Sequence, residues 1–269
     1  MAIHDSLGDR MKEYESRNQY YLQKRTPVAI RVDMRAGHTF TRGFARPFDE
    51  VFGNTMVRAM EYCAKNIGNC VFAYCQSDEI TFILVDYAKL ETDAWFDYRT
   101  DKLCSISASM ATMAFNKFFA EEVRDWRDKT FPIDCLSQRT GELSSESIKL
   151  SEVYALAEHK GALFDARCFN IPKEEACNLV YWRQLDATRN SIQMVGQANF
   201  SHKELQGCSC SVIQDMLHEQ KGINWNDFPT RWKRGTAWTR AGGVNFEMPI
   251  LKGDGRKYVD DVIYIEEEM

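Results

Sequence analysis

The sequence contains no long hydrophobic run and no excess of positive charge. No stretch approaches the ~18 consecutive apolar residues of a membrane-spanning helix, so we expect no membrane association. Lysine and arginine total 34 against 39 acidic residues, a formal net charge of −5. Proteins that coat nucleic acid non-specifically carry a basic surface, so this balance argues against that class. It remains compatible with an enzyme that grips one end of an RNA through a local basic patch.

A paired-cysteine pattern and a hydrophobic leader are also missing. The nine cysteines are odd in number and scattered, and residues 1–16 are polar and charged. We therefore expect no signal peptide, free thiols and a cytoplasmic location. One group of candidate zinc ligands comprises His202, Cys208, Cys210 and His218. Its spacing matches no common zinc pattern and its segment also fits a helix, so the sequence favours a helix there.

The hydrophobic pattern predicts an alternation of strands and helices. The predicted elements are strands over 27–33, 70–75, 80–85 and 162–170, with helices over 48–67 and 102–123. The resulting β-α-β-β-α-β order is the ferredoxin-like topology used by polymerase palms and nucleotide cyclases. We therefore predict an α+β fold built on a ferredoxin-like polymerase palm with a mostly helical C-terminal extension.

Two regions are expected on either side of residue 170. Residues 1–170 form the palm-like catalytic domain, opened by an amphipathic helix and carrying a polar, serine-rich insertion, predicted to be mobile, near residues 130–155. Residues 171–269 form a mostly helical C-terminal region, with helices over 173–195 and 201–220. A final strand is predicted over 258–265.

Acidic residues occur at two strand ends that the topology brings together. Asp33 ends the first predicted strand, and Asp78 and Glu79 lie in the tip of the hairpin that follows. Magnesium takes oxygen ligands, usually one or two carboxylates with phosphate oxygens and water. The pattern predicts a catalytic site of Asp33, Asp78 and Glu79 that holds two Mg²⁺ ions for nucleotidyl transfer. Neighbouring strand residues point to opposite faces, so Asp78 is the expected ligand and Glu79 its supporter. Solvated turn residues are the alternative.

Candidate phosphate and RNA contacts lie in two segments. The loop after Asp33, MRAGHTF, is placed to wrap a triphosphate with backbone N–H groups. The candidate phosphate cations are Arg35, His38, Arg46 and Lys102. Residues 225–240 interleave tryptophans with Arg231, Lys233 and Arg234, which suits stacking on unpaired nucleotides while holding phosphates. Core tryptophans with solvated cations are the alternative there.

Several motifs together resemble one enzyme family. In order, RVDMRAGHTF, RPFDE, AYCQSDEITFIL, YRTDKLCSISAS, FDAR and YWRQLDATRN resemble the tRNA-His guanylyltransferase family of 3′–5′ polymerases, over roughly residues 25–195. The resemblance implies that the 3′-hydroxyl of an incoming nucleotide attacks an activated 5′ end of a tRNA under two magnesium ions. It also implies a homotetramer, with residues 171–269 serving for tRNA contact and as the oligomer interface.

The resemblance assigns roles to individual residues. Asp33, Asp78 and the backbone carbonyl of Met34 would be metal ligands. The implied contacts to GTP, ATP or another NTP are Asp33, Met34, Arg35, Ala36, Gly37, His38, Arg46, Asp49, Ser77, Asp78 and Lys102. The candidate tRNA contacts are Arg183, Arg189, Arg231, Lys233 and Arg234.

Departures from the family pattern favour one branch. Met34 stands where the family usually has glycine, and Phe48 replaces the asparagine of its KPND element. Residues 187–190, Ala-Thr-Arg-Asn, replace the His-Ile-Asn-Asn of eukaryotic members. This favours the guanylyltransferase-like branch, which resembles a template-directed polymerase that repairs truncated tRNA 5′ ends. The alternatives are a tRNA-His guanylyltransferase adding G at position −1, a nucleotide cyclase, and a non-catalytic RNA-binding relative.

Overall fold

A six-stranded antiparallel sheet forms the centre of the computed structural model, which describes residues 6–132 and 144–265. The strands are β1 (Val28–Met34), β2 (Cys70–Gln76), β3 (Glu79–Leu84), β4 (Phe164–Asn170), β5 (Thr236–Thr239) and β6 (Gly243–Asn245). Their order is β4-β1-β3-β2-β5-β6. The first four strands follow the ferredoxin-like order, which confirms the predicted palm topology.

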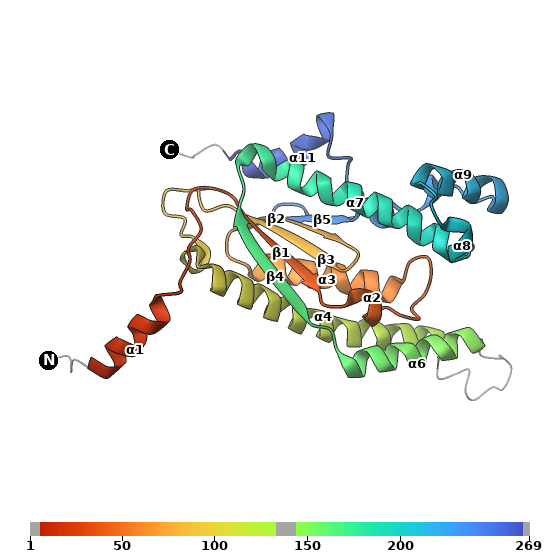
Figure 1. Cartoon of the computed structure of the whole chain (residues 1–269), viewed down its shortest axis with the longest axis horizontal. Helices are drawn as coiled ribbons and strands as arrows, with labels where there is room; N and C mark the ends of the chain where they lie inside the picture. The colour runs from red at the N-terminus through yellow and green to blue at the C-terminus, as the bar shows by residue number, and fades with distance from the viewer. Residues whose placement is uncertain (1–5, 133–143, 266–269) are drawn as a thin grey trace.

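Two layers of helices cover the sheet (Figure 1). Helices α3 (Glu50–Asn66) and α4 (Thr100–Thr130) pack on one face, and α7 (Lys173–Asn199) and α11 (Lys257–Ile263) on the other. The shorter helices are α1 (Ser6–Ser16), α2 (Gly37–Phe40), α6 (Ser145–Lys160), α8 (His202–Leu205), α9 (Cys210–Lys221) and α10 (Thr230–Arg234). Single 3₁₀ turns occupy Trp95–Tyr98, Trp225–Asp227 and Gly253–Arg256. Helix α1 projects from the body and none of its residues is buried.

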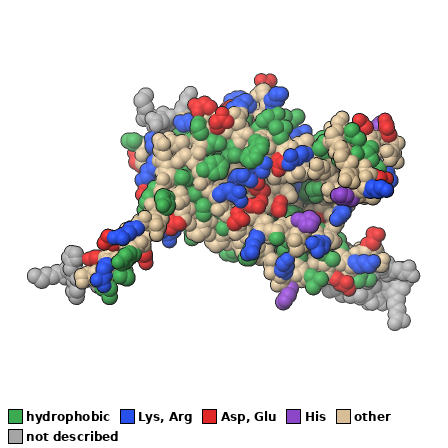
Figure 2. All heavy atoms as spheres, viewed as in Figure 1, with side chains coloured by type: hydrophobic (Ala, Val, Ile, Leu, Met, Phe, Trp, Pro, Cys, Tyr) green, Lys and Arg blue, Asp and Glu red, His purple; other side chains and the backbone are tan. Residues whose placement is uncertain are grey.

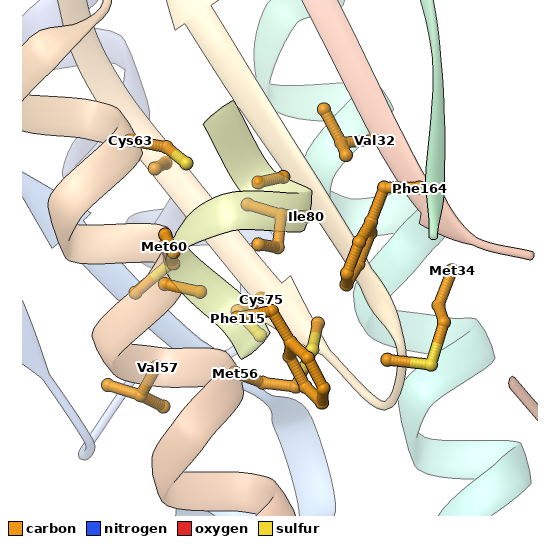
Figure 3. Close-up of a cluster of buried hydrophobic side chains, with 14 of the residues drawn as sticks. Val32, Met34, Met56, Val57, Met60, Cys63, Cys75, Ile80, Phe115 and Phe164 are labelled. Carbon is orange, nitrogen blue, oxygen red and sulfur yellow. The ribbon is translucent and has the colours of Figure 1, made fainter. Parts of the chain in front are cut away.

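The alternation predicted for β1 is present in the structure. Val28, Ile30 and Val32 lie in the core between the sheet and α3 and α4, because alternate strand residues share a face. Figure 3 shows Val32 and Met34 in this core, with Met34 beside Phe164. The intervening residues of β1 therefore face α7, and they include the two charged residues of the strand.

Two predicted elements are wrong. Residues 144–155 are not a mobile insertion: Ser144 caps α6, and the described part of that segment is helical, with Tyr154 packed in the core. Residues 133–143 lie outside the described residues. The predicted strand over 258–265 is instead helix α11, because Val259 and Ile263, four residues apart, share the stripe that packs on the sheet.

The C-terminal region continues the sheet of the catalytic region. Strand β5 pairs with β2 along Phe72–Cys75, and β6 pairs with β5. The sequence predicted loops and short strands over residues 222–269 but gave no bounds for these two strands. Helix α7 confirms the helix predicted over 173–195. The helix predicted over 201–220 is instead divided into α8 and α9, with Gly207 between them at φ 78°. The division into two regions at residue 170 stays a prediction.

Cysteines and candidate zinc ligands are scattered over the described chain. The eight cysteines within the described ranges carry free thiols. Residues 6–132 and 144–265 contain no group of three or more His, Cys, Asp or Glu that could hold a metal, so His202, Cys208, Cys210 and His218 form no such group. None of the helices in these ranges is long and apolar enough to cross a membrane.

Candidate active site

The end of β1, the β2–β3 hairpin tip and the start of α2 meet at one place. The N–H of Met34 donates to the carbonyl of Asp78 at 3.0 Å, and the strand register pairs Asp33 with Glu79. The Asp78 carboxylate lies against Gly37, where an added Cβ would come within 1.9 Å of Oδ2. The structure therefore brings together Asp33, Met34, Gly37 and Asp78, all of which were predicted site residues.

The hairpin tip is tighter than the sequence suggested. Strand β2 continues through Gln76 and β3 begins at Glu79, so only Ser77 and Asp78 form the turn. Ser77 has a left-handed backbone at φ 49°, a common requirement of two-residue hairpin turns. Asp78 is thus a turn residue. The different positions of the Asp78 and Glu79 side chains follow from the turn, and not from the alternation of a regular strand.

Burial and neighbouring carboxylates disfavour the ionised forms of both aspartates. Burial raises the pKa of Asp33 to about 6, with further increases from the negative charges of Asp78, Glu79 and Asp165, while Arg167 opposes them. Burial also raises the pKa of Asp78, against the opposing effect of hydrogen bonds from its own N–H and the Ser77 hydroxyl. Two partly buried carboxylates that repel each other favour a bound cation. Because the donors are oxygens and only two carboxylates converge, the set fits magnesium, which takes its other ligands from phosphate and water.

Met34 can stand where the family usually has glycine because its backbone is unstrained. The left-handed residue in this loop is Ala36, at φ 56°, while Met34 continues the strand conformation of β1. The Met34 side chain is buried in the core, pointing away from the solvent side of the site. The residue can therefore present its backbone to the site without a glycine. That its carbonyl binds metal stays a prediction.

Glu79 is held by two arginines. Its Oε2 accepts hydrogen bonds from Arg31 and, at 3.2 Å, from Arg183, which also pairs with Asp186 at 3.4 Å. Arg183 is only 7% exposed, and its guanidinium stacks on Trp182. We therefore correct the prediction that Arg183 contacts tRNA: its guanidinium is committed to positioning Glu79. Arg31 was missed, although the alternation of β1 already placed it on the face of Asp33.

A cavity of about 290 Å³ opens beside the hairpin tip. Its walls come from the segment between α2 and α3, from the tip, from α7 and from α10. Figure 2 shows the surface hollowed between α2 and the α8–α9 lobe. The predicted site residues that line it are His38, Arg46, Asp49, Ser77 and Arg231. Four of the eleven predicted nucleotide contacts, His38, Arg46, Asp49 and Ser77, thus line one cavity that borders the hairpin tip.

Asp49 lines this cavity, but its carboxylate is already bonded on both oxygens. Oδ1 accepts from the N–H of Phe52 at 2.8 Å and caps α3, and Oδ2 accepts from the N–H of Ala45 at 2.9 Å and from the Tyr154 hydroxyl at 2.7 Å. Asp49 therefore fixes the shape of the wall. Tyr154 was missed because it lies in the segment predicted as an insertion.

Lys102 is far from the aspartate pair within the chain. Thr112 of α4 accepts from the N–H of Phe164, at the end of β4 that pairs with the end of β1. Lys102 lies ten residues earlier on α4, which corresponds to about 15 Å along the helix axis. The neighbouring Thr100 contacts Cys168, further along β4 and away from the site. Figure 1 shows α4 beginning at the end of the sheet opposite the hairpin tip. The structure therefore does not join Lys102 to the site, contrary to the prediction.

Among the remaining predicted cations, two have side chains that already bind partners within the protein. Arg231 stacks on Trp232 at 4.2 Å and donates to Asn54 at 2.9 Å. Lys233 donates to the carbonyl of Asn226, and Trp232 stacks on Phe48 at 5.1 Å. The segment over 225–240 thus forms a packed wall of the cavity.

The exposed cations lie around the rim. Arg35 and His38 are exposed, and the backbone N–H of Arg35 donates to Leu163 at 2.8 Å. Arg189 is exposed and pairs with Asp186 on its own helix. Arg234 is only partly exposed, and its Nε is buried without a partner. Of the predicted tRNA contacts, Arg189 presents the most accessible guanidinium.

A ferredoxin-like palm with two aspartates at the ends of β1 and of the hairpin, beside a cavity, is an arrangement suited to metal-assisted chemistry on nucleoside triphosphates. The model of the tRNAHis guanylyltransferase family matches residues 8–172, more than half of the chain. The chain belongs to the tRNAHis guanylyltransferase family.

Solved structures and curated relatives agree with this family. The chain is 38% identical to a bacterial tRNA(His) guanylyltransferase (Thg1)-like protein in complex with ATP, with 96% of this chain and 100% of that chain covered and a TM-score of 0.78. A bacterial Thg1-like protein in complex with GTP gives 33% identity, the same coverage and a TM-score of 0.69. The tRNA(His) guanylyltransferase of Saccharomyces cerevisiae is 25% identical over 235 residues, 81% of this chain and 84% of that protein.

Proposed function

We propose that this protein adds nucleotides in the 3′–5′ direction to the 5′ end of truncated tRNA, each paired against the 3′ strand. The observation that carries the proposal is the pair Asp33 and Asp78, whose ionised forms are disfavoured by burial and by neighbouring carboxylates, beside a cavity of about 290 Å³. This arrangement supports binding of metal-bound triphosphate at the hairpin tip.

Different residues of the chain would bind the metal ions and the phosphates. Asp33 and Asp78, with the Met34 carbonyl, would hold two magnesium ions, which would activate the attacking 3′-hydroxyl and neutralise the triphosphate leaving group. Gly37 leaves room for the Asp78 carboxylate. His38, at the cavity rim, is placed to contact phosphate oxygens.

Arg46 and Ser77 are placed to contact the same phosphates from the cavity wall. Glu79, held by Arg31 and Arg183, keeps β3 and the tip in register with β1. The chain thus binds and orients both reactants, while its charges are arranged around the point where phosphate must lie.

The repair reaction is preferred over addition of G at −1 because of the cavity wall on α7. Ala187 and Asn190 line the cavity, in the stretch where eukaryotic members carry His-Ile-Asn-Asn. The hydroxyl of Thr188 donates to the carbonyl of Lys233 at 3.1 Å, which ties this stretch to α10. The higher identity to a bacterial Thg1-like protein than to the yeast enzyme supports the same choice. By resemblance, we further propose a cytoplasmic homotetramer.

The decisive experiment varies the template. A 5′-truncated, 5′-triphosphorylated tRNA is incubated with each NTP and magnesium, and the nucleotide opposite the missing position is then changed on the 3′ strand. We expect the added nucleotide to follow the template, and Asp78→Asn to abolish addition. Untemplated G on tRNA-His alone would instead identify the guanylyltransferase reaction. Conversion of NTP without RNA would identify a cyclase, and RNA binding without any product would identify a non-catalytic relative.

A further inference from the structure

Trp182 on α7 exposes about half of a large aromatic surface near the aspartate pair. Its side chain is 52% exposed, although the next two residues of the helix, Arg183 and Gln184, are buried. An exposed indole offers a large, flat apolar face on which a nucleotide base can stack. Leu185, about one turn further along α7, is similarly exposed at 51%.

The ring of Trp182 is fixed relative to the hairpin tip. The guanidinium carbon of Arg183 lies 3.7 Å from the ring centroid, and that of Arg31 lies 5.5 Å from it. Both guanidiniums donate to the same oxygen of Glu79, which directly follows Asp78. The indole is therefore a pre-oriented surface, and a ligand that stacks on it loses little further side-chain entropy from the protein.

Trp182 and the cavity border different strands of the sheet near the aspartate pair. The cavity is lined by the end of β2 and by the tip, whereas Trp182 contacts Arg31 of β1. In the sheet, β3 separates β1 from β2. Arg31 precedes Asp33 by two residues on one face of β1, about 7 Å along the strand. A nucleotide in the cavity and a base on Trp182 would thus approach the aspartates from two sides.

The surface around Trp182 carries charges of both signs. Figure 2 shows Lys and Arg side chains gathered with Asp and Glu below α7. Arg189 pairs with Asp186, and Arg167 of β4 pairs with Asp165 at 3.2 Å. Because Arg167 and Arg189 each have a carboxylate partner, these two pairs add little net charge to the face. Recognition here should therefore depend more on stacking than on phosphate attraction.

We propose that Trp182 is a stacking platform for the base at the 5′ end of the RNA acceptor, which places that end beside Asp33 and Asp78. The proposal rests on the proposed function for the identity of the ligand as RNA. An aromatic face accepts every base, as a repair enzyme acting on different truncated ends requires. The guanidiniums of Arg183 and Arg31 hold the ring in place.

The test measures RNA binding and NTP binding separately. The probe is an acceptor-stem minihelix that lacks one 5′ nucleotide, titrated with the full chain in magnesium without NTP. Trp182→Ala should weaken RNA binding about tenfold, the order expected for loss of one base–aromatic stack. Trp182→Phe, which keeps an aromatic face, should restore most of the affinity. Leu185→Ala, an exposed apolar residue one turn away, is the matched control and should bind RNA like the wild type.

Two further readouts distinguish stacking from a displaced active site. The slope of log Kd against log salt concentration should be the same for wild type and Trp182→Ala, because no phosphate contact is removed. Affinity for a fluorescent ATP analogue should also be unchanged, which shows that Glu79 has not moved. Loss of analogue binding, or RNA affinity within twofold of wild type, would overturn the proposal.

Extension activity and RNA affinity together distinguish failure of the stacking platform from failure of the proposed function. If wild type does not extend any RNA but Trp182→Ala still weakens RNA binding, the stacking platform stands and the repair function falls. If wild type extends the RNA and Trp182→Ala changes neither its Kd nor its KM for RNA, the platform alone is wrong.

Discussion

Replacing Gly37 by alanine tests how closely the site depends on the position of Asp78. An added Cβ would lie 1.9 Å from Oδ2 of Asp78, whereas real Cβ contacts stay beyond about 3.0 Å. The carboxylate must therefore move by at least about 1.1 Å. Gly37 has no left-handed backbone, so alanine itself is sterically acceptable to the chain. The substitution acts mainly on the position of the carboxylate.

Misplacement of a reacting group by about 1 Å costs on the order of 10²-fold in rate. We therefore expect Gly37→Ala to lower the rate of nucleotide addition about a hundredfold, equivalent to about 2.7 kcal/mol of transition-state stabilisation. The apparent affinity for magnesium should fall as well, because Asp78 is one of the two proposed ligands. The assay is single-turnover extension of a truncated tRNA over a magnesium titration, with thermal unfolding of the same samples.

Gly242→Ala is the matched control. Gly242 also lacks a left-handed backbone, and its nearest neighbour for a new Cβ is the Thr239 hydroxyl at 3.0 Å, away from the hairpin tip. This variant should keep wild-type activity. If Gly37→Ala retained the wild-type rate at every magnesium concentration, the reasoning that places Asp78 as a ligand packed on Gly37 would be refuted. A loss of activity that only followed loss of folding would refute it too.

Three further predictions concern single side chains. Asp33→Asn should abolish addition yet raise the melting temperature in EDTA at pH 7.5, because the raised pKa of Asp33, about 6, means that folding disfavours its ionised carboxylate. The gain in melting temperature should shrink at pH 5, where the carboxyl group of the folded wild type is largely protonated. An equal gain at both pH values would contradict this origin. Tyr154→Phe removes a hydrogen bond to the buried Asp49 carboxylate and should lower the free energy of unfolding by about 2 kcal/mol in chemical denaturation, whereas no change would show that the bond contributes nothing net. Lys102→Ala should change NTP affinity by no more than about twofold, as for surface residues away from a site, and a large loss in a binding titration would contradict its placement.

Local patterns were sufficient to predict most of the fold. The alternation of Val28, Ile30 and Val32 identified β1, and the apolar runs on either side of Ser77 identified the hairpin. The order of these elements then required Asp33 and Asp78 to approach each other, because the ferredoxin-like topology pairs the first strand with the third. The central part of the site followed from topology alone.

Contacts between distant segments were the part that could not be predicted. The bonds from Arg183 to Glu79 and from Tyr154 to Asp49 join residues more than a hundred positions apart, and no local pattern links one partner to the other. Helix α11 was misassigned because its β-branched residues have strand propensity, which packing against the sheet overrides. Lys102 was placed at the site by motif position, although the direction of α4 carries it to the opposite end.

The pairing of β5 with β2 has a consequence for dividing the chain. A fragment that ended at residue 170 would leave β2 as an edge strand and would uncover Phe72 and Tyr74, which now pack against α7, α11 and Ala237. An uncovered edge beside large apolar side chains promotes pairing with other chains. The segment matched by the family model would therefore be prone to aggregation by itself, and any minimal active version must retain β5.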